Sequence, residues 1–176
     1  MSKSPKLKKK NYIFVLWGEY FDEVAATIFA SALRRASLCV KIVGVHGPEA
    51  AGCHGVTLQS DISLGEALTF VNQALCLVLP CSTAAVKRME LDPRIHYFFS
   101  QARKNRAKFV VYDSSIIQQS LLSSLTIPPY EIATYCETEN LLVFAHGVAD
   151  ALVHIEQAPV PALQTALDEL VLTHWS

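Results

Sequence analysis

Residues 108–122, KFVVYDSSIIQQSLL, decide the fold. Residues with strong strand preference, Phe109 to Tyr112, lead directly into Asp113, and a helical pattern follows at once. A buried strand that turns abruptly into a helix is typical of an open α/β sheet, in which side chains at the carboxyl end of a strand face the crevice beside the sheet. The residue at such a bend is commonly a nucleophile or part of a phosphate-binding loop. Asp113 is therefore the first candidate functional residue.

Length and composition indicate a globular protein with a large core. The chain has 176 residues, of which 51% are hydrophobic and 18% charged, so it can bury a sizeable core. Residues 11–176 are predicted to form one domain. Residues 1–10, which are rich in lysine, are predicted to be a disordered tail that is either simply solvated or contacts an acidic partner. The net charge of −1 gives no support for a nucleic-acid-binding or membrane-binding surface.

The cysteines favour a reduced, cytoplasmic protein. There are five, an odd number, and no C-x-x-C pair occurs, which argues against zinc-ribbon and thioredoxin-like chemistry. Several lie in apolar strand-like runs, where a thiol behaves as a small hydrophobic group. A metal site built from His46, Cys53 and His54 would match no recognised ligand spacing. We therefore expect neither a metal nor another cofactor.

Strand-like and helical patterns alternate along the chain. The predicted strands are 12–17, 39–45, 56–58, 75–79 and 109–112, and the predicted helices between them are 21–36, 63–68, 82–89 and 92–106. Two late strands, 130–136 and 141–145, are predicted to form a hairpin, with helices over 147–157 and 161–172 after it. This order predicts a flavodoxin-like α/β three-layer sandwich, with a mostly parallel sheet and helices on both faces.

Several segments resemble one protein family in their order and spacing. They are Phe21-Asp-Glu-Val24, Leu33-Arg-Arg-Ala36, Cys39-Val-Lys-Ile-Val-Gly-Val, Gly47-Pro-Glu-Ala-Ala-Gly-Cys53, Ser60-Asp-Ile-Ser-Leu-Gly-Glu-Ala67, Leu77-Val-Leu-Pro80 and Phe144-Ala-His-Gly147. On these segments the chain resembles the ThiJ/PfpI superfamily of class I glutamine amidotransferase-like folds, which includes the Parkinson-disease-associated protein deglycase. The resemblance implies the same fold and, at Cys53, a position near a two-fold interface between subunits.

The residues that give this family its chemistry are replaced. The resemblance implies a cysteine at the strand-to-helix bend, with a pKa lowered by the helix N-terminus and a nearby glutamic acid. Asp113 occupies the position of that cysteine, and Ala25 that of the glutamic acid. Cys81 and Ser82 stand where the family has a Gly-Gly pair that serves an oxyanion. The resemblance also implies a histidine after the bend, and none lies between the helix that follows the bend and Tyr130. Chemistry that needs a thiolate cannot use residue 113.

Asp113 allows three interpretations. As a helix N-cap, its carboxylate would accept hydrogen bonds from backbone N–H groups of the first turn and suit the positive end of the helix dipole. As a ligand-binding residue, it would act in an inherited pocket together with Ser114, Ser115, Cys81 and Ser82. As a carboxylate nucleophile, it would attack a substrate directly.

Two further side chains are candidates for chemistry at the same crevice. By the resemblance, Cys81 lies at the carboxyl end of the neighbouring strand and precedes a helix start, which can lower the pKa of a thiol; the alternative is a buried, inert cysteine. His146 follows the last predicted strand and would line the same mouth as a base. Trp17, with Tyr20 and Phe21, would either fill the ancestral pocket or simply pack in the core.

These observations favour a non-catalytic ThiJ/PfpI-like domain that acts by binding or regulation, as a homodimer or with another protein partner. One alternative is an enzyme of the hydrolase or glyoxalase type whose rearranged site uses Cys81 or Asp113, with His146 as the base. The other is a sensor that binds a small metabolite at the bend, through Asp113, Ser114 and Ser115.

Overall fold

A six-stranded sheet that is parallel throughout forms the centre of the computed structural model, which describes residues 10–157. Its order is β5-β2-β1-β6-β7-β8. The strands are β1 Tyr12–Trp17, β2 Val40–Gly44, β5 Ile62–Ser63, β6 Ala74–Leu79, β7 Lys108–Val111 and β8 Ile132–Thr134. Nearly every residue of β1, β6 and β7 is buried, because helices cover both faces of these central strands.

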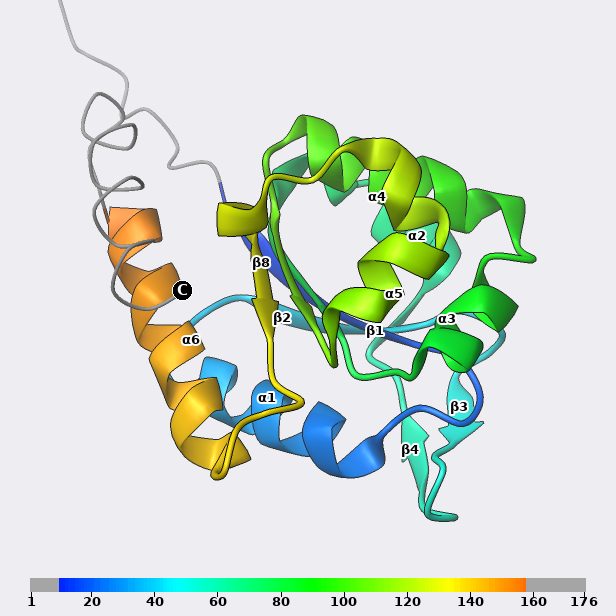
Figure 1. The fold of residues 1–176 in the computed structure, drawn as a ribbon, viewed down its shortest axis with the longest axis horizontal. Helices are drawn as coiled ribbons and strands as arrows, with labels where there is room; N and C mark the ends of the chain where they lie inside the picture. Colours follow the sequence, from blue (N-terminus) through cyan, green and yellow to red (C-terminus); the bar gives the residue numbers. More distant parts are fainter. Residues whose placement is uncertain (1–9, 158–176) are drawn as a thin grey trace, which may run out of the picture.

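The helices form the two outer layers. α1 and α6 cover one face of the sheet, and α2, α4 and α5 lie on the other, with α3 beside α5 (Figure 1). The helices are α1 Glu23–Arg35, α2 Leu64–Leu68, α3 Thr83–Met89, α4 Pro93–Lys104, α5 Ser114–Gln119 and α6 Leu141–Gln157, and the short 3-10 helices are η1 Val71–Gln73, η2 Leu121–Leu125 and η3 Pro129–Glu131. The predicted flavodoxin-like three-layer α/β fold is confirmed.

The predicted late hairpin is wrong. Residues 141–145 are not a strand but the beginning of α6, which continues to Gln157. The predicted strand 130–136 is shorter, since η3 and β8 together occupy 129–134. β8 pairs in parallel with β7 at the edge of the sheet, where a hairpin would have paired antiparallel.

The burial pattern of α6 explains this difference. Ala145, Val148, Ala149 and Leu152 are buried, and their spacing is that of one helical face. Phe144 packs edge-on against Phe29 of α1, with ring centroids 6.2 Å apart. The run LLVFA suits a buried strand equally well over five residues, so only the longer period distinguishes the two.

A separate two-stranded antiparallel sheet follows β2. It consists of β3 Glu49–Ala51 and β4 Thr57–Gln59, of which only a strand near 56–58 was predicted. The turn that joins them lies against the start of α1, because the N–H of Cys53 donates to the carbonyl of Phe21 over 2.8 Å. This contact places the β3–β4 turn, residues 52–56, at the carboxyl edge of the main sheet.

Two helix starts follow from local sequence signals. Ser63 and Glu66, spaced as S-x-x-E, form a capping box at the start of α2. Asp92 caps α4, and Pro93 occupies its first position. The predictions of a disordered tail over 1–10 and of a helix over 161–172 fall on residues 1–9 and 158–176, outside the described residues. Between residues 10 and 157, no helix is both long and apolar enough to cross a membrane.

We predict that Leu152→Ala lowers the free energy of unfolding by about 2–5 kcal/mol, because a fully buried side chain would be replaced by a cavity. Val143→Ala, on the solvent side of α6 with a 65% exposed side chain, is the matched control and should change the unfolding free energy by less than about 0.5 kcal/mol. Urea denaturation measures both variants. If the two variants changed the unfolding free energy equally, the packing of α6 on α1 would be contradicted.

Candidate functional site

The bend between β7 and α5 carries Asp113, as predicted, and its side chain caps the helix. The Asp113 carboxylate accepts hydrogen bonds from the backbone N–H of Ser115, at 2.7 Å, and from the Ser115 hydroxyl. The hydroxyl oxygen of Thr83, in α3, lies 3.0 Å from that of Ser115. The capping interpretation of Asp113 is therefore confirmed, and its carboxylate is already engaged by its own helix.

A cavity of about 240 Å³ lies beside this bend. Its lining residues are Tyr20, Asp22, Cys53, Cys81, Ser82, Tyr112 and Tyr135. Two of the predicted ligand-binding residues, Cys81 and Ser82, belong to this set. Asp113, Ser114 and Ser115 lie outside it, so a ligand in the cavity would meet hydroxyl groups, aromatic rings and one carboxylate rather than the bend itself.

Cys81 reaches the cavity but lacks the properties of a reactive thiol. It is 1% exposed, and burial raises the pKa of its thiol to about 12. The next residue, Ser82, accepts the N–H of Ala85 and caps α3, which starts at Thr83. Position 81 therefore stands before a helix start, as predicted, but its burial gives no support to the interpretation of Cys81 as a nucleophile.

Position 25, where the resemblance implies a glutamic acid, holds a buried methyl group. Ala25 is fully buried in α1, and its N–H donates to the Asp22 side chain over 2.9 Å. Asp22 thus caps α1 and lines the cavity at the same time. Sequence reasoning missed Asp22 as a cavity residue, although an aspartate directly before a helix is a capping signal that the sequence does carry.

His146 is not at the exit of a strand. It lies within α6, on the face of the sheet that α1 and α6 cover, and outside the lining of the cavity. The prediction that it lines the mouth depended on the strand over 141–145, which the structure replaces with helix. Tyr112 and Tyr135, which no motif singled out, line the mouth instead and pack edge-to-face with centroids 5.5 Å apart.

The aromatic residues after β1 divide between core and surface. Trp17 and Phe21 are buried and stack with centroids 4.5 Å apart and an interplanar angle of 11°. Tyr20 is 58% exposed and lies under the guanidinium of Arg88, 5.0 Å from its ring centre. Core packing accounts for Trp17 and Phe21, whereas Tyr20 lines the cavity.

The acid at the start of α1, Glu23, is buried against the β3–β4 turn. Its Oε1 accepts the backbone N–H groups of His54, at 2.8 Å, and Val56, at 3.3 Å. Gly52 makes this approach possible, because a Cβ at position 52 would lie 2.2 Å from Oε2 of Glu23. The turn and the helix are thus joined by one carboxylate.

The hydrogen bonds determine the charge of Glu23. Burial by itself would raise the pKa of its carboxyl group, but the backbone N–H donors and the His54 ring together lower the pKa to about 2. Burial and the neighbouring Glu23 and Asp22 carboxylates raise the pKa of the Cys53 thiol above its ordinary value. At neutral pH the cluster therefore contains a carboxylate beside a protonated thiol.

The set of His46, Cys53 and His54, whose spacing does not predict a metal site, is not assembled. His46 lies beside Gly18, in a different hollow from the cavity that Cys53 lines. Glu23 takes its place, since the ligand atoms of Glu23, Cys53 and His54 all lie within 4.8 Å of one another. Sequence spacing could not have found this set, because Glu23 and His54 are 31 positions apart.

Among known proteins, only solved structures match this chain, and they match it in fold. No protein-family model matches the sequence, and no curated protein matches it. Solved structures do match. Toxoplasma gondii DJ-1 in its oxidised form superimposes with a TM-score of 0.63 at 12% identity, over 92% of this chain and 98% of that one. Drosophila melanogaster DJ-1beta gives a TM-score of 0.60 at 14% identity over 92% and 98%.

A cysteine-to-alanine mutant of a DJ-1 superfamily protein from Salmonella typhimurium also matches, with a TM-score of 0.60 at 18% identity over 91% of this chain and 97% of that one. The chain has the DJ-1/ThiJ/PfpI fold. At such identities the likeness extends to the fold alone, and the function of this chain has to be argued from its own residues.

We predict that Glu23→Gln removes a stabilisation that depends on pH. The carboxylate, with a pKa of about 2 in the folded chain against an ordinary 4.5, stabilises the fold above pH 4.5. This contribution is lost as the pH falls from 4.5 towards 2. The variant should therefore be less stable than the native chain at neutral pH, and the difference should shrink in acid. Thermal unfolding across this pH range measures it, with Glu19→Gln, an exposed acid, as the control.

We also predict that iodoacetamide modifies the exposed Cys53 and Cys136 of the native protein before Cys81. Burial protects Cys81 and keeps it protonated at neutral pH. Mass spectrometry of peptides after timed quenching gives the order of modification, and denatured protein serves as the control for intrinsic labelling. Rapid labelling of Cys81 in the native state would contradict the assignment of an inert thiol.

Proposed function

We propose that the chain is a non-catalytic domain of the ThiJ/PfpI type that acts by binding or regulation. The proposal rests on the two candidate nucleophiles at the bend. The carboxylate of Asp113 caps α5. The thiol of Cys81, on the neighbouring strand, is buried, and its pKa is raised. Nucleophilic catalysis needs an exposed and activated group. Neither candidate nucleophile meets this requirement.

The alternative enzyme with a rearranged site has less support. Its base, His146, lies in α6, outside the lining of the cavity. A sensor could bind its ligand in the cavity of about 240 Å³. The polar side chains that line this cavity are not Asp113 to Ser115, as expected, but include Tyr112, Tyr135, Ser82 and Asp22. Binding therefore fits the cavity better than chemistry does. Five free cysteines support a reduced, cytoplasmic location as part of the proposal.

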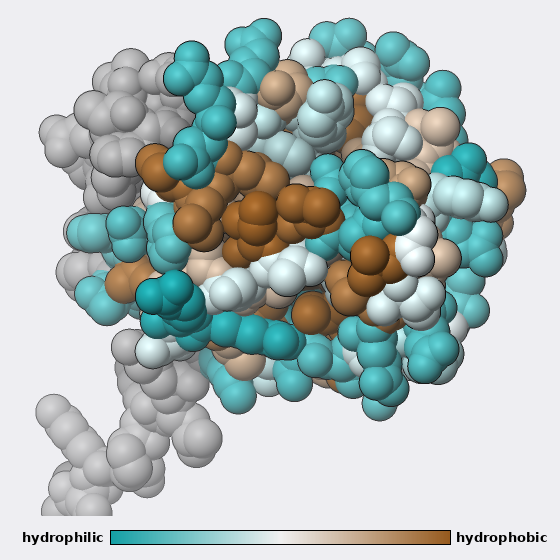
Figure 2. Space-filling view, turned by 90° about the horizontal axis from the view of Figure 1, so that it is seen from below, coloured by the Kyte–Doolittle hydropathy of each residue, from teal (hydrophilic) through white to brown (hydrophobic). Residues whose placement is uncertain are grey.

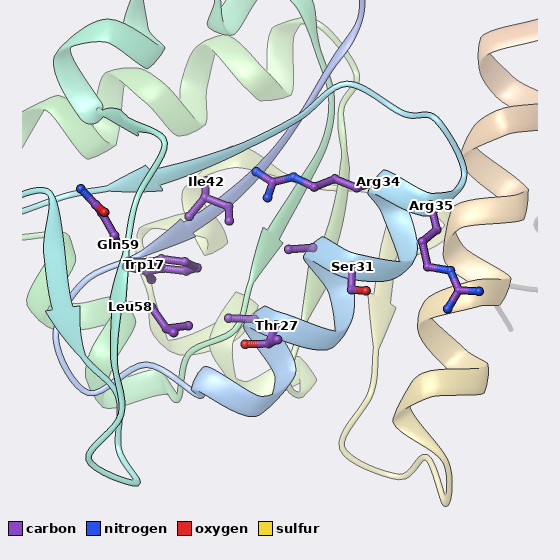
Figure 3. Close-up of a pocket in the computed structure, with 10 residues that line it drawn as sticks. Trp17, Thr27, Ser31, Arg34, Arg35, Ile42, Leu58 and Gln59 are labelled. Carbon is purple, nitrogen blue, oxygen red and sulfur yellow. The ribbon is translucent and has the colours of Figure 1, made fainter.

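The binding surface that we propose is the face of α1, and the first partner is a second copy of the chain. A groove of about 560 Å³ runs between α1, β2 and β4. Figure 3 shows its floor of Trp17, Ile42 and Leu58, with Arg34 reaching over it and Arg35 pointing away. Arg34 is held by Asp61 at 2.5 Å, so an ion pair lies beside this apolar floor.

The ridge beside this groove is apolar as well. Val24 on α1 is 53% exposed, Val56 beside β4 is 51% exposed, and Ile28 is half-buried. Figure 2 shows apolar surface gathered on the side of the molecule that α1 and α6 form. Because groove and ridge lie side by side on one helix, a two-fold axis would place each ridge against the groove of the other copy. Cys53, predicted to lie near the interface, is close to this edge.

We predict that the protein sediments as a dimer, and that Ile28→Glu, which places a charge in the contact, converts it to a monomer without loss of far-UV circular dichroism. Leu91→Glu is the matched control: this side chain is 83% exposed, directly before the capping residue of α4 on the opposite layer. Analytical ultracentrifugation over a range of concentrations decides. A monomer at every concentration would contradict the dimer.

Catalysis is tested separately. We predict that the protein consumes methylglyoxal no faster than the Cys81→Ala and Asp113→Asn variants do, because neither side chain is positioned for attack. Turnover by the native protein that disappears in either variant would overturn the non-catalytic proposal and favour the rearranged enzyme. Near-UV circular dichroism of the variants checks that each is folded.

A further inference from the structure

Three donor atoms of different chemistry converge where α1 begins. Glu23 is the first residue of α1, and Cys53 and His54 lie in the β3–β4 turn. The Sγ of Cys53 lies 3.3 Å from Nδ1 of His54 and 3.7 Å from Oε2 of Glu23. The same Nδ1 and Oε2 are 3.2 Å apart. The three atoms therefore form a nearly equilateral triangle of sulfur, nitrogen and oxygen.

This triangle has the dimensions of one face of a tetrahedral zinc site. Zinc bonds of roughly 2.3 Å to sulfur and 2.0–2.2 Å to nitrogen and oxygen, at tetrahedral angles, place the ligand atoms about 3.4–3.6 Å apart. The separations of 3.2–3.7 Å in the protein lie within a few tenths of an ångström of those values. Thiolate, imidazole and carboxylate together are a donor set that suits zinc.

The structure holds these donors in place by contacts that do not use the ligand atoms. Oε1 of Glu23 accepts the N–H groups of His54 and Val56, which leaves Oε2 for the triangle. The backbone N–H of Cys53 is bonded to the carbonyl of Phe21 at 2.8 Å. Such outer contacts orient the ligands of a metal site and account for much of its affinity.

The triangle is also open on one side. The Glu23 side chain is 4% exposed, whereas that of His54 is 63% exposed, and Cys53 is exposed and lines the cavity beside the bend. An ion above the triangle would be held by the protein on one side and would meet solvent or a small molecule on the other. Three protein ligands would leave a fourth position at which water or a small molecule can bind, unlike the closed four-ligand sites that are purely structural.

We propose that Glu23, Cys53 and His54 bind a divalent cation of the zinc class, with the fourth coordination position open. On binding, the Cys53 thiol releases its proton to the solvent, and the sulfur coordinates the ion as a thiolate. Nδ1 of His54 donates to Glu23 in the protein without an ion; on binding it gives this proton to solvent while Nε2 takes one up, so that the neutral ring supplies a lone pair from Nδ1. Oε2 of Glu23 supplies the negative charge. The site lies within one chain, so it does not depend on the proposed dimer.

The same three side chains could also be held together by hydrogen bonds alone, without an ion. Titration with Co²⁺ distinguishes a metal site from such a cluster. Full-length protein is treated with a chelator under reducing conditions, dialysed and titrated with Co²⁺. We expect a thiolate-to-cobalt charge-transfer band and the intense visible bands of tetrahedral cobalt, both removed by stoichiometric Zn²⁺. Absence of the charge-transfer band in the native protein would overturn the proposal.

Variants assign the ligands. Cys53→Ser should abolish the charge-transfer band, and His54→Ala should weaken cobalt binding by at least about tenfold. Cys136→Ser, which removes another exposed cysteine, should leave the spectrum and the affinity unchanged. A band that survives in Cys53→Ser, or that is lost in Cys136→Ser, would show that the ion binds elsewhere and would overturn the site. Far-UV circular dichroism confirms that each variant is folded.

Discussion

The cavity at the carboxyl edge of the sheet depends on the hydrogen bonds of the buried Glu23 carboxylate. An ionised acid that is 3% exposed is costly unless hydrogen bonds compensate for the water it loses. The N–H groups of His54 and Val56 provide that compensation, and the position of Glu23 in the first turn of α1 adds the positive end of the helix dipole. One side chain therefore connects two segments that are far apart in the sequence.

This connection fixes the wall of the cavity that faces the bend. Asp22 precedes Glu23 and caps α1, while Cys53 follows Gly52, whose missing side chain admits the carboxylate. The bend of β7 and α5 lies outside the lining of the cavity and carries Asp113, which caps its own helix. Ala25, in the first turn of α1, is a buried methyl group. At this edge an acid, a thiol and an imidazole therefore meet at the β3–β4 turn rather than at the bend of β7 and α5.

Much of the fold could be predicted because its signals are local or continuous. Buried parallel strands such as β1, β6 and β7 appear as unbroken apolar runs, and the caps at Ser63, Asp92 and Asp113 depend on neighbours within three positions. The helix predicted over 147–157 begins earlier, at Leu141. Its first five residues resemble a strand because they are apolar all round, and only the later spacing reveals one buried face.

The site was less predictable for a physical reason. Glu23 looks like any first-turn acid in the sequence, and its role depends on a turn 29–33 positions later that folds back against it. Tyr112 and Tyr135 belong to no motif and meet only because β7 and β8 pair in parallel. Tertiary proximity, rather than spacing, brings these groups together.

The ionisation of Glu23 is the most direct test of this account. Carbon-detected NMR of the Glu23 side-chain carboxyl group, followed through an acid titration of the full-length protein, reports its protonation in the folded state. We predict that the carboxylate stays ionised through pH 4.5 and protonates only near pH 2. A Glu23 carboxyl group that protonates at its ordinary pKa of 4.5 or above would mean that the turn does not hold it, and would contradict the account.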